Sequence, residues 1–270
     1  MNRSEIYECL YSQACDVLCE MMKGDSQLSK ISWKQLDSKY LQGEKANYTV
    51  MSLGDIYQRL LKSAQNYQSM PNVIKFDDEK RHEIIGRHLD NYDIRKIAVM
   101  DVDSLYRNLR EEFAPTSNDT HYNCWYKWSQ SAIGAAKFLS DFTDAEDFRQ
   151  FVKCFDYNTP TRMALPMLIS SKIKGIGFAL ACDFLKELGY LNYPKPDVHL
   201  IDVFSAIGLT EKDPVKVFEE IIRMAMTCNA TPYKLDKIIW LVCSGNFYRE
   251  KVKIPGHKQE LIERVKNTIC

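Results

Sequence analysis

The sequence has no apolar run long enough to cross a lipid bilayer. Its longest runs, such as residues 238–243, are far shorter than the about 20 residues that a membrane-spanning helix needs. The first residues, Met-Asn-Arg-Ser-Glu, lead into a charged amphipathic stretch and lack the apolar centre of a signal peptide. We therefore expect a protein without a membrane span, located in the cytoplasm, or in the nucleus of a eukaryotic cell.

The sequence also lacks an excess of either charge. Its 36 Lys and Arg residues balance its 36 Asp and Glu residues, so the formal net charge at pH 7 is +0. Composition therefore gives no sign of a nucleic-acid partner. It does not exclude one, because a local basic face and backbone amides can bind phosphate while acidic residues elsewhere cancel the total charge.

Closely spaced cysteines, which would indicate a metal site or a disulfide framework, are missing as well. The nine cysteines are odd in number and scattered in spacing. Cys15 and Cys19 lie one helical turn apart, but no second Cys or His pair lies near them in sequence to complete a zinc site. Since free thiols are usual in the cytosol, we expect buried thiols and no metal ion.

Strand patterns, repeats and low-complexity linkers are scarce too. The best strand candidate, Val73–Phe76, is short and isolated. Apolar residues instead recur at three- and four-residue steps, as from Ile6 to Met21, and Ser52 with Asp55 forms a helix-capping pattern. The sequence predicts one compact all-α protein of about ten to twelve helices. Besides two helices discussed below, we expect helices over residues 6–22, 52–70, 77–89, 101–113, 122–141, 144–155, 213–228, 232–244 and 258–268.

Residues 166–189 contain the pattern that carries most information. Pro166 is suited to the first turn of a short helix, because its missing N–H would have no partner there. Gly175-Ile176-Gly177 then interrupts the apolar periodicity, and a second helix runs from Phe178 to a stop at Gly189. The pattern predicts two short antiparallel helices joined by a tight Gly-apolar-Gly turn.

Such a hairpin has a direct physical use. The two glycines allow a ligand to approach the backbone closely, and the amides at the start of the second helix carry the positive end of its dipole. This arrangement binds phosphate without reading base sequence. An ordinary helical corner remains the alternative interpretation. The residues expected to contact a nucleic-acid backbone are Lys172, Lys174, Gly175, Ile176, Gly177, Phe178 and Ala179.

A second pattern, Pro194-Lys195-Pro196-Asp197-Val198-His199, follows the hairpin. Pro196 forces extended backbone on its predecessor, so we expect a rigid loop that leads into a helix. Asp197 stands at the N-cap position of that helix, and an N-cap role alone would explain an acid there.

The hairpin and the acid twenty residues later together resemble the helix–hairpin–helix glycosylase superfamily, which includes endonuclease III, the adenine-mismatch glycosylases and the 8-oxoguanine glycosylases. In this superfamily a loop rich in Gly and Pro follows the hairpin and ends in an essential Asp, often within Asp-x-His. Asp197-Val198-His199 fits, and is most similar to the 8-oxoguanine branch. The specific resemblance covers residues 165–209, and a weaker helical similarity covers residues 52–248.

The resemblance implies a fold of two interlocked helical subdomains. It divides the chain into an N-terminal helical segment (1–50), a glycosylase domain (51–250, with the hairpin at 166–189) and a C-terminal helical tail (251–270). It also implies a DNA N-glycosylase of base-excision repair that acts on double-stranded DNA. We expect a monomer, associated with the nucleoid if the host is a bacterium. The base lesion cannot be read from the sequence.

The resemblance further implies the chemistry. Asp197 would stabilise the positive charge that develops on the sugar as the bond to a flipped base breaks, and would orient the attacking water. Members that also cut the strand carry a Lys where this sequence has Ala179, so we expect base removal without lyase activity. Lys172, Lys174 and Lys186 are nearby in sequence, but none matches the motif. Lys186 on the second hairpin helix could in principle replace that Lys, but we expect it at the surface.

Cofactors are not expected. Many relatives bind an iron–sulfur cluster after the catalytic Asp, but here only Cys228, Cys243 and Cys270 follow Asp197, too widely spaced for a cluster. The resemblance leaves open a monovalent or divalent cation at the hairpin.

Further site residues follow from position in the family pattern. His199 is expected to contact a phosphate or the acid loop. Gln65, Gln68, Trp125, Asp236 and Trp240 are candidates for a wedge or a base pocket, with loop polarity and core packing as the competing interpretations for Gln65, Gln68 and Trp125. Two alternatives to the enzyme remain: a catalytically inactive DNA-binding or damage-sensing protein, and a helical protein-interaction domain.

Overall fold

The computed structural model describes residues 1–43, 51–68 and 70–269. Helices account for 69% of the structure, and one pair of two-residue strands completes it, which confirms the all-α prediction. In these ranges no helix combines the length and apolarity needed to span a bilayer. The strands β1 (Asn246–Phe247) and β2 (Val252–Lys253) pair in antiparallel register and were not expected from sequence.

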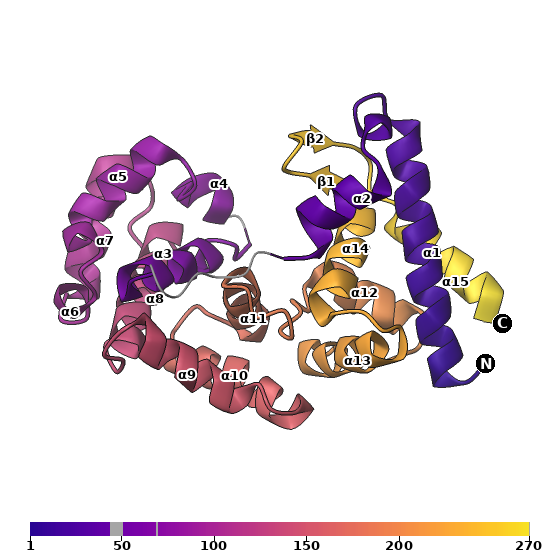
Figure 1. Cartoon of the computed structure of the whole chain (residues 1–270). Helices are drawn as coiled ribbons and strands as arrows, with labels where there is room; N and C mark the ends of the chain where they lie inside the picture. The colour runs from indigo at the N-terminus through magenta and orange to yellow at the C-terminus, as the bar shows by residue number, and fades with distance from the viewer. Residues whose placement is uncertain (44–50, 69, 270) are drawn as a thin grey trace. The chain divides into compact units, whose positions relative to one another are not determined.

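The chain forms two compact units. One, here the terminal unit, contains residues Met1–Lys45 and Gly189–Cys270, and the other, the central unit, contains Ala46–Leu188. Both ends of the chain therefore belong to the same unit, in which the indigo α1 and the yellow α15 pack against each other (Figure 1). The division of the chain into segments 1–50, 51–250 and 251–270 stays a prediction, because compactness does not measure the extent of a resemblance.

The terminal unit is a helical bundle. α1 packs against α13, α14 and α15, and α12 packs against α13, α14 and α15. The predicted apolar stripe of the first helix is buried in the core at Leu10, Ala14 and Val17. The elements are α1 (Arg3–Gly24), α2 (Trp33–Leu36), α12 (Val198–Ala206), α13 (Pro214–Thr227), α14 (Pro232–Ser244) and α15 (Lys258–Ile269), with a 3₁₀ turn at Leu28–Lys30 and a π turn at Asp37–Leu41.

The central unit is built around α8, which packs against α3, α4, α6, α7 and α10. Asp55 N–H donates to Ser52 Oγ (3.2 Å) and Ser52 N–H donates to Asp55 Oδ2 (2.8 Å), so the predicted capping pattern starts α3. The elements are α3 (Leu53–Ala64), α4 (Met70–Ile74), α5 (Glu79–His88), α6 (Ile94–Ile97), α7 (Val102–Phe113), α8 (Cys124–Leu139), α9 (Ala145–Phe155), α10 (Thr159–Lys172) and α11 (Phe178–Glu187), with a 3₁₀ turn at Asp90–Tyr92.

Two local predictions were wrong. The strand candidate Val73–Phe76 begins inside α4, because so short an apolar run does not distinguish a strand from a buried helical turn. Pro166 lies inside α10 rather than in its first turn. That helix starts earlier, where the Asn158 side chain accepts the Thr161 N–H (3.0 Å) and Pro160 occupies the first turn.

Candidate functional site

The predicted hairpin forms in the central unit from α10, the turn 173–177 and α11. Gly175 has φ +90°, a backbone conformation that favours glycine. A Cβ atom there would also collide with the Ser131 hydroxyl of α8, which donates to the Lys174 carbonyl at 2.9 Å. Ile176 is buried in the core, 2% exposed. The packing of the turn on α8 therefore requires a glycine at position 175.

Gly177 is different, since the turn does not require it. Its φ is −84°, and a Cβ atom there would meet nothing within 4 Å. Gly177 is the N-cap of α11 without a side-chain hydrogen bond to the first turn, and Phe178 and Ala179 are partly exposed. The start of α11 is thus open to a ligand at the end of the helix that favours anions.

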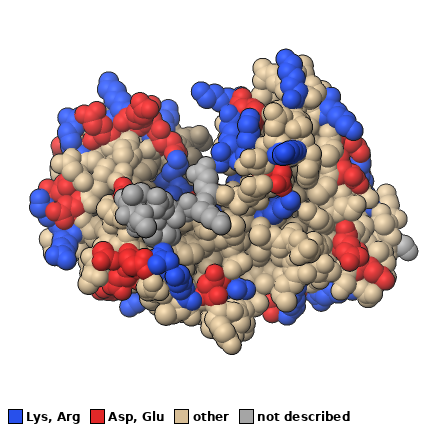
Figure 2. Space-filling model, in the orientation of Figure 1, with Lys and Arg blue, Asp and Glu red and all other residues tan. Residues whose placement is uncertain are grey.

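Two lysines place positive charge beside this turn. Lys172 and Lys174 are exposed beside the glycines. On the face drawn in Figure 2, by contrast, Lys and Arg are interspersed with Asp and Glu. A ligand bound at the turn would meet a positive backbone dipole and two flexible cations, which suits a phosphate.

A pocket of about 400 Å³ lies beside the turn and includes Lys174 and Gly175 in its lining. Tyr122 is 84% exposed and Tyr67 is 39% exposed, and the Lys127 ammonium lies 5.9 and 5.7 Å from their ring centroids. Exposed aromatic rings beside a cation provide stacking surfaces for nucleobases. Tyr67 was not among the residues identified from the sequence.

Two residues predicted for the wedge or base pocket are buried in the core. Gln65 is 2% exposed; its side-chain amide donates to Asp77 Oδ2 (2.7 Å) and accepts the Phe76 N–H (2.8 Å). Trp125 is 1% exposed and stacks on Phe113 at 4.9 Å. For both residues the structure agrees with the competing interpretation, in which these polar and aromatic groups are used in packing, and their roles at a base pocket stay predictions. Gln68 is exposed, and its role stays a prediction.

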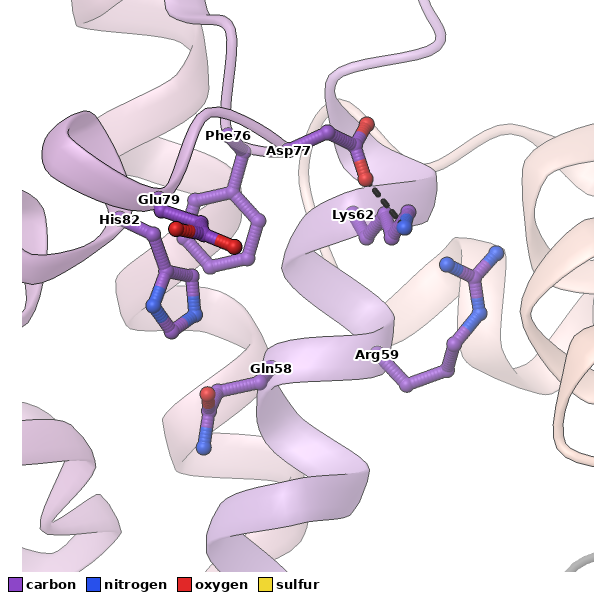
Figure 3. A pocket seen from close by; sticks show the side chains of 7 residues that line it. All are labelled: Gln58, Arg59, Lys62, Phe76, Asp77, Glu79 and His82. Atoms are coloured by element: carbon purple, nitrogen blue, oxygen red, sulfur yellow. Dashed lines mark ion pairs between the residues drawn. The ribbon is translucent and has the colours of Figure 1, made fainter.

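Asp77 also forms an ion pair with Lys62 of α3, at a hollow of about 460 Å³ (Figure 3). Arg59, whose side chain extends from the same helix in that view, approaches Asp183 of α11 to 3.5 Å. Asp183 is 5% exposed and accepts from Ser63 Oγ at 2.9 Å. This buried carboxylate joins α11 to α3 and so fixes the helix whose start forms the hairpin turn.

Asp197 lies in the terminal unit, where it is half-buried at the start of α12. Its Oδ1 accepts the backbone N–H groups of His199 (2.9 Å) and Leu200 (3.3 Å), so the predicted N-cap is confirmed. Hydrogen bonds of this kind stabilise a carboxylate. Nevertheless the pKa of Asp197 is raised above its ordinary value, mainly by burial and next by the Asp236 carboxylate. Lys195 and His199 lower this pKa, but by less. The environment therefore disfavours negative charge on a carboxyl group that has kept some exposure.

The surroundings of Asp197 include a second acid and an imidazole. Asp236 of α14 is 1% exposed and accepts the Lys195 N–H at 2.7 Å. His199 Nδ1 is buried and has no hydrogen-bond partner among the described residues. Val198, which lies between Asp197 and His199 in the sequence, is 63% exposed. The functional roles of these residues stay predictions.

Trp240 is half-buried on α14 beside Lys237. The Lys237 ammonium lies 5.4 Å from the Trp240 ring centroid, 5.6 Å from that of Tyr233 and 5.2 Å from that of Tyr248. Lys237 is 5% exposed. One turn of α14 thus carries a buried cation held among aromatic rings.

Lys186, expected at the surface, is only 5% exposed, so that prediction was wrong. It follows the inward face of α11, whose neighbours Phe184 and Leu185 are 0% exposed. Within the described ranges, no three His, Cys, Asp or Glu side chains form a group that could hold a metal ion. The expectation that the protein binds no cofactor therefore rests on the sequence alone.

Comparison with known proteins gives one clear likeness. No protein-family model and no curated protein sequence matches the chain. The crystal structure of Methanocaldococcus jannaschii 8-oxoguanine glycosylase/lyase in complex with a 15-mer DNA containing 8-oxoguanine matches with a TM-score of 0.51 and 15% sequence identity, over 85% of this chain and 96% of that one. At this identity the likeness concerns the fold.

Proposed function

Because the chain has the fold of the helix–hairpin–helix glycosylases, we propose that it is a DNA N-glycosylase of base-excision repair. The single observation that carries the proposal is Asp197, a half-buried carboxylate at the start of α12 whose pKa is raised by burial and by Asp236. A residue that only capped a helix would gain from full ionisation and solvent. Perturbed carboxylates of this kind are concentrated at catalytic sites.

The hairpin would bind the DNA backbone. The fold requires Gly175 but leaves open space where a side chain at Gly177 would stand, so the missing side chain gives access to the α11 amides. A phosphate at those amides, with Lys172 and Lys174 alongside, would hold double-stranded DNA without base selectivity. The solved glycosylase with this fold is bound to lesion-containing DNA, which supports the same partner here.

The target base must leave the helical stack before its glycosidic bond can be reached, which costs a few kcal/mol and is easiest for a damaged or mispaired base. The exposed rings of Tyr67 and Tyr122, rather than the buried Gln65, are suited to stack on bases of the distorted duplex. Trp240 remains our candidate for contact with the extruded base.

Asp197 would act when the bond breaks. Its ionised carboxylate would stabilise the developing positive charge on the sugar and accept a proton from the attacking water. Ala179 stands where bifunctional relatives have their Lys nucleophile, so we propose hydrolysis by water without strand cleavage.

The test is base release from duplex oligonucleotides that contain 8-oxoguanine, an alkylated purine, uracil or an adenine mismatch. Wild type should release one of these bases and Asp197→Asn should not, while both bind the duplex equally. DNA binding without release by either protein would favour a damage-sensing role, and no salt-dependent DNA binding would favour a protein-interaction domain. Borohydride trapping of a covalent DNA complex would overturn the assignment to water.

A further inference from the structure

The loop that delivers Asp197 is tied to the first turns of α14 at two points. Tyr233 N–H donates to the Leu191 carbonyl at 3.0 Å, and the Asp236 carboxylate accepts the Lys195 N–H at 2.7 Å. Within the loop, Asp197 N–H donates to the Lys195 carbonyl at 2.9 Å. The position of Asp197 is therefore linked through one peptide, Lys195, to a side chain 41 residues later in the sequence.

The chemistry of this tie is unusual for a loop. Lys195 stands between Pro194 and Pro196, neither of which has an amide hydrogen, so its N–H is the one backbone donor that residues 194–196 offer. The acceptor is a carboxylate that is 1% exposed. A carboxylate accepts a stronger hydrogen bond than a neutral oxygen, but burying it is costly unless its position matters.

We propose that Asp236 is a positioning residue for Asp197, whose carboxylate fixes the Lys195 peptide and thereby the reacting acid. The proposal rests on the proposed function, in which Asp197 is the catalytic group, and it assigns to Asp236 a role other than contact with the base. The hydrogen bond from the Lys195 N–H to the Asp236 carboxylate of α14 carries it. The raised pKa of Asp197 next to Asp236 agrees with this closeness but is not needed for it.

Three variants separate position from charge. Asp236→Asn keeps an oxygen at the same distance but loses the charge. Asp236→Glu keeps the charge but moves the oxygens by one methylene group. Asp236→Ala loses both. Glu220→Gln is the matched control, since Glu220 is another buried carboxylate of the terminal unit (3% exposed) that binds Arg3 at 3.0 Å.

Activity is read as the single-turnover rate of base release from the lesion duplex that wild type processes, and binding as the Kd for a duplex with a tetrahydrofuran abasic site. A misplacement of about 1 Å costs about a hundredfold in rate. We expect Asp236→Ala and Asp236→Glu to slow release by roughly tenfold to a hundredfold at a Kd within about twofold of wild type, while Asp236→Asn stays within about threefold. Glu220→Gln should match wild type.

Other outcomes overturn the proposal. If Asp236→Asn is as slow as Asp236→Ala while Asp236→Glu is active, charge and not position is what matters. If the variants change which base is released, Asp236 reads the base. If Kd rises in parallel with the loss of rate, Asp236 contributes to binding.

A readout without DNA separates this proposal from the proposed function. Since prolines flank Lys195, the amides of Lys195 and Asp197 are the two that exchange with deuterium in residues 194–197. We expect faster exchange there in Asp236→Ala and Asp236→Glu, and protection in Asp236→Asn and Glu220→Gln, even if wild type releases no base. Unchanged exchange in Asp236→Ala would show that the hydrogen bond from Lys195 to Asp236 does not hold the loop. If Asp236→Ala does not fold, the exchange rates of Asp236→Glu and Asp236→Asn can be compared in the same way.

Discussion

The hairpin of the central unit and the Asp197 loop of the terminal unit present their functional atoms in opposite ways. The hairpin offers backbone amides, and side chains such as Ile176 and Ser131 only fix the turn. The loop offers a side chain, and its backbone is fixed by Asp236 from another helix. A backbone site depends on conformation and on open space above the amides, whereas a side-chain site depends on the electrostatics around one group.

The largest expected effect distinguishes two acids of α12. Asp197→Asn should reduce base release by at least a hundredfold, as the loss of one group that stabilises transition-state charge does. Asp202→Asn should stay within about twofold, because Asp202 forms ion pairs with Lys258 (2.6 Å) and Lys212 (3.6 Å). Single-turnover assays on the same lesion duplex measure both. Equal losses would mean that α12 as a whole, and not Asp197, carries activity.

The stabilities of these two variants should change in opposite directions. Because the pKa of Asp197 is raised in the folded protein, ionising this carboxyl group reduces the free energy of unfolding. This cost appears as the pH rises from the ordinary Asp range through the raised pKa. Asn removes the cost and still caps the helix. The Lys258 ion pair lowers the pKa of Asp202, so its contribution is present at neutral pH and lost as pH falls through the lowered pKa. At pH 7, urea denaturation should find Asp197→Asn more stable than wild type and Asp202→Asn less stable by roughly 0.5 kcal/mol.

The next effect compares the two hairpin glycines. Gly175→Ala should lower the free energy of unfolding by about 1–3 kcal/mol, because the position has φ +90° and the added methyl group meets Ser131. Gly177→Ala should leave stability within about 0.5 kcal/mol of wild type, yet weaken DNA binding roughly tenfold by covering the α11 amides. Thermal unfolding and duplex binding distinguish them. Normal DNA affinity in a folded Gly177→Ala protein would remove the hairpin from the interface.

A smaller effect concerns the charges of the same turn. Lys172→Ala and Lys174→Ala should each reduce the slope of log Kd against log salt by about 1, since each lysine neutralises one phosphate. Because both residues are exposed, stability should hardly change. Lys216→Ala in α13, which removes an exposed lysine paired with Glu211, is the control and should leave the slope unchanged. An unchanged slope in all three proteins would contradict phosphate binding at the turn.

The same contrast explains what the sequence could predict. The hairpin turn, the Ser52 cap and the Asp197 cap are local: their partners lie within a few residues, so spacing is enough to predict them. The burial of Gln65 depends on Asp77 and Phe76, and that of Trp125 depends on Phe113, partners that no periodicity specifies. The tie from Lys195 to Asp236 spans 41 residues and is equally invisible. Spacing therefore predicted the capping position of Asp197, whereas it gave no sign that packing uses both ends of the Gln65 amide.

The smallest effect is a shift in the pH profile of base release, which tests the electrostatic half of the comparison. Asp197 must be ionised to act, so the rate should rise with pH through a midpoint above the ordinary Asp value of about 3.9. Asp236→Asn removes the negative neighbour and should move that midpoint down, whereas His199→Ala removes a group that lowers the pKa of Asp197 and should move it up. Asp202→Asn, which changes charge on the same helix, should leave the midpoint in place. Single-turnover rates between about pH 4 and 8, with intrinsic fluorescence to confirm folding at each pH, would measure these shifts. A midpoint that does not move in Asp236→Asn would mean that burial alone sets the pKa of Asp197, so that α14 holds the reacting acid in place without tuning it.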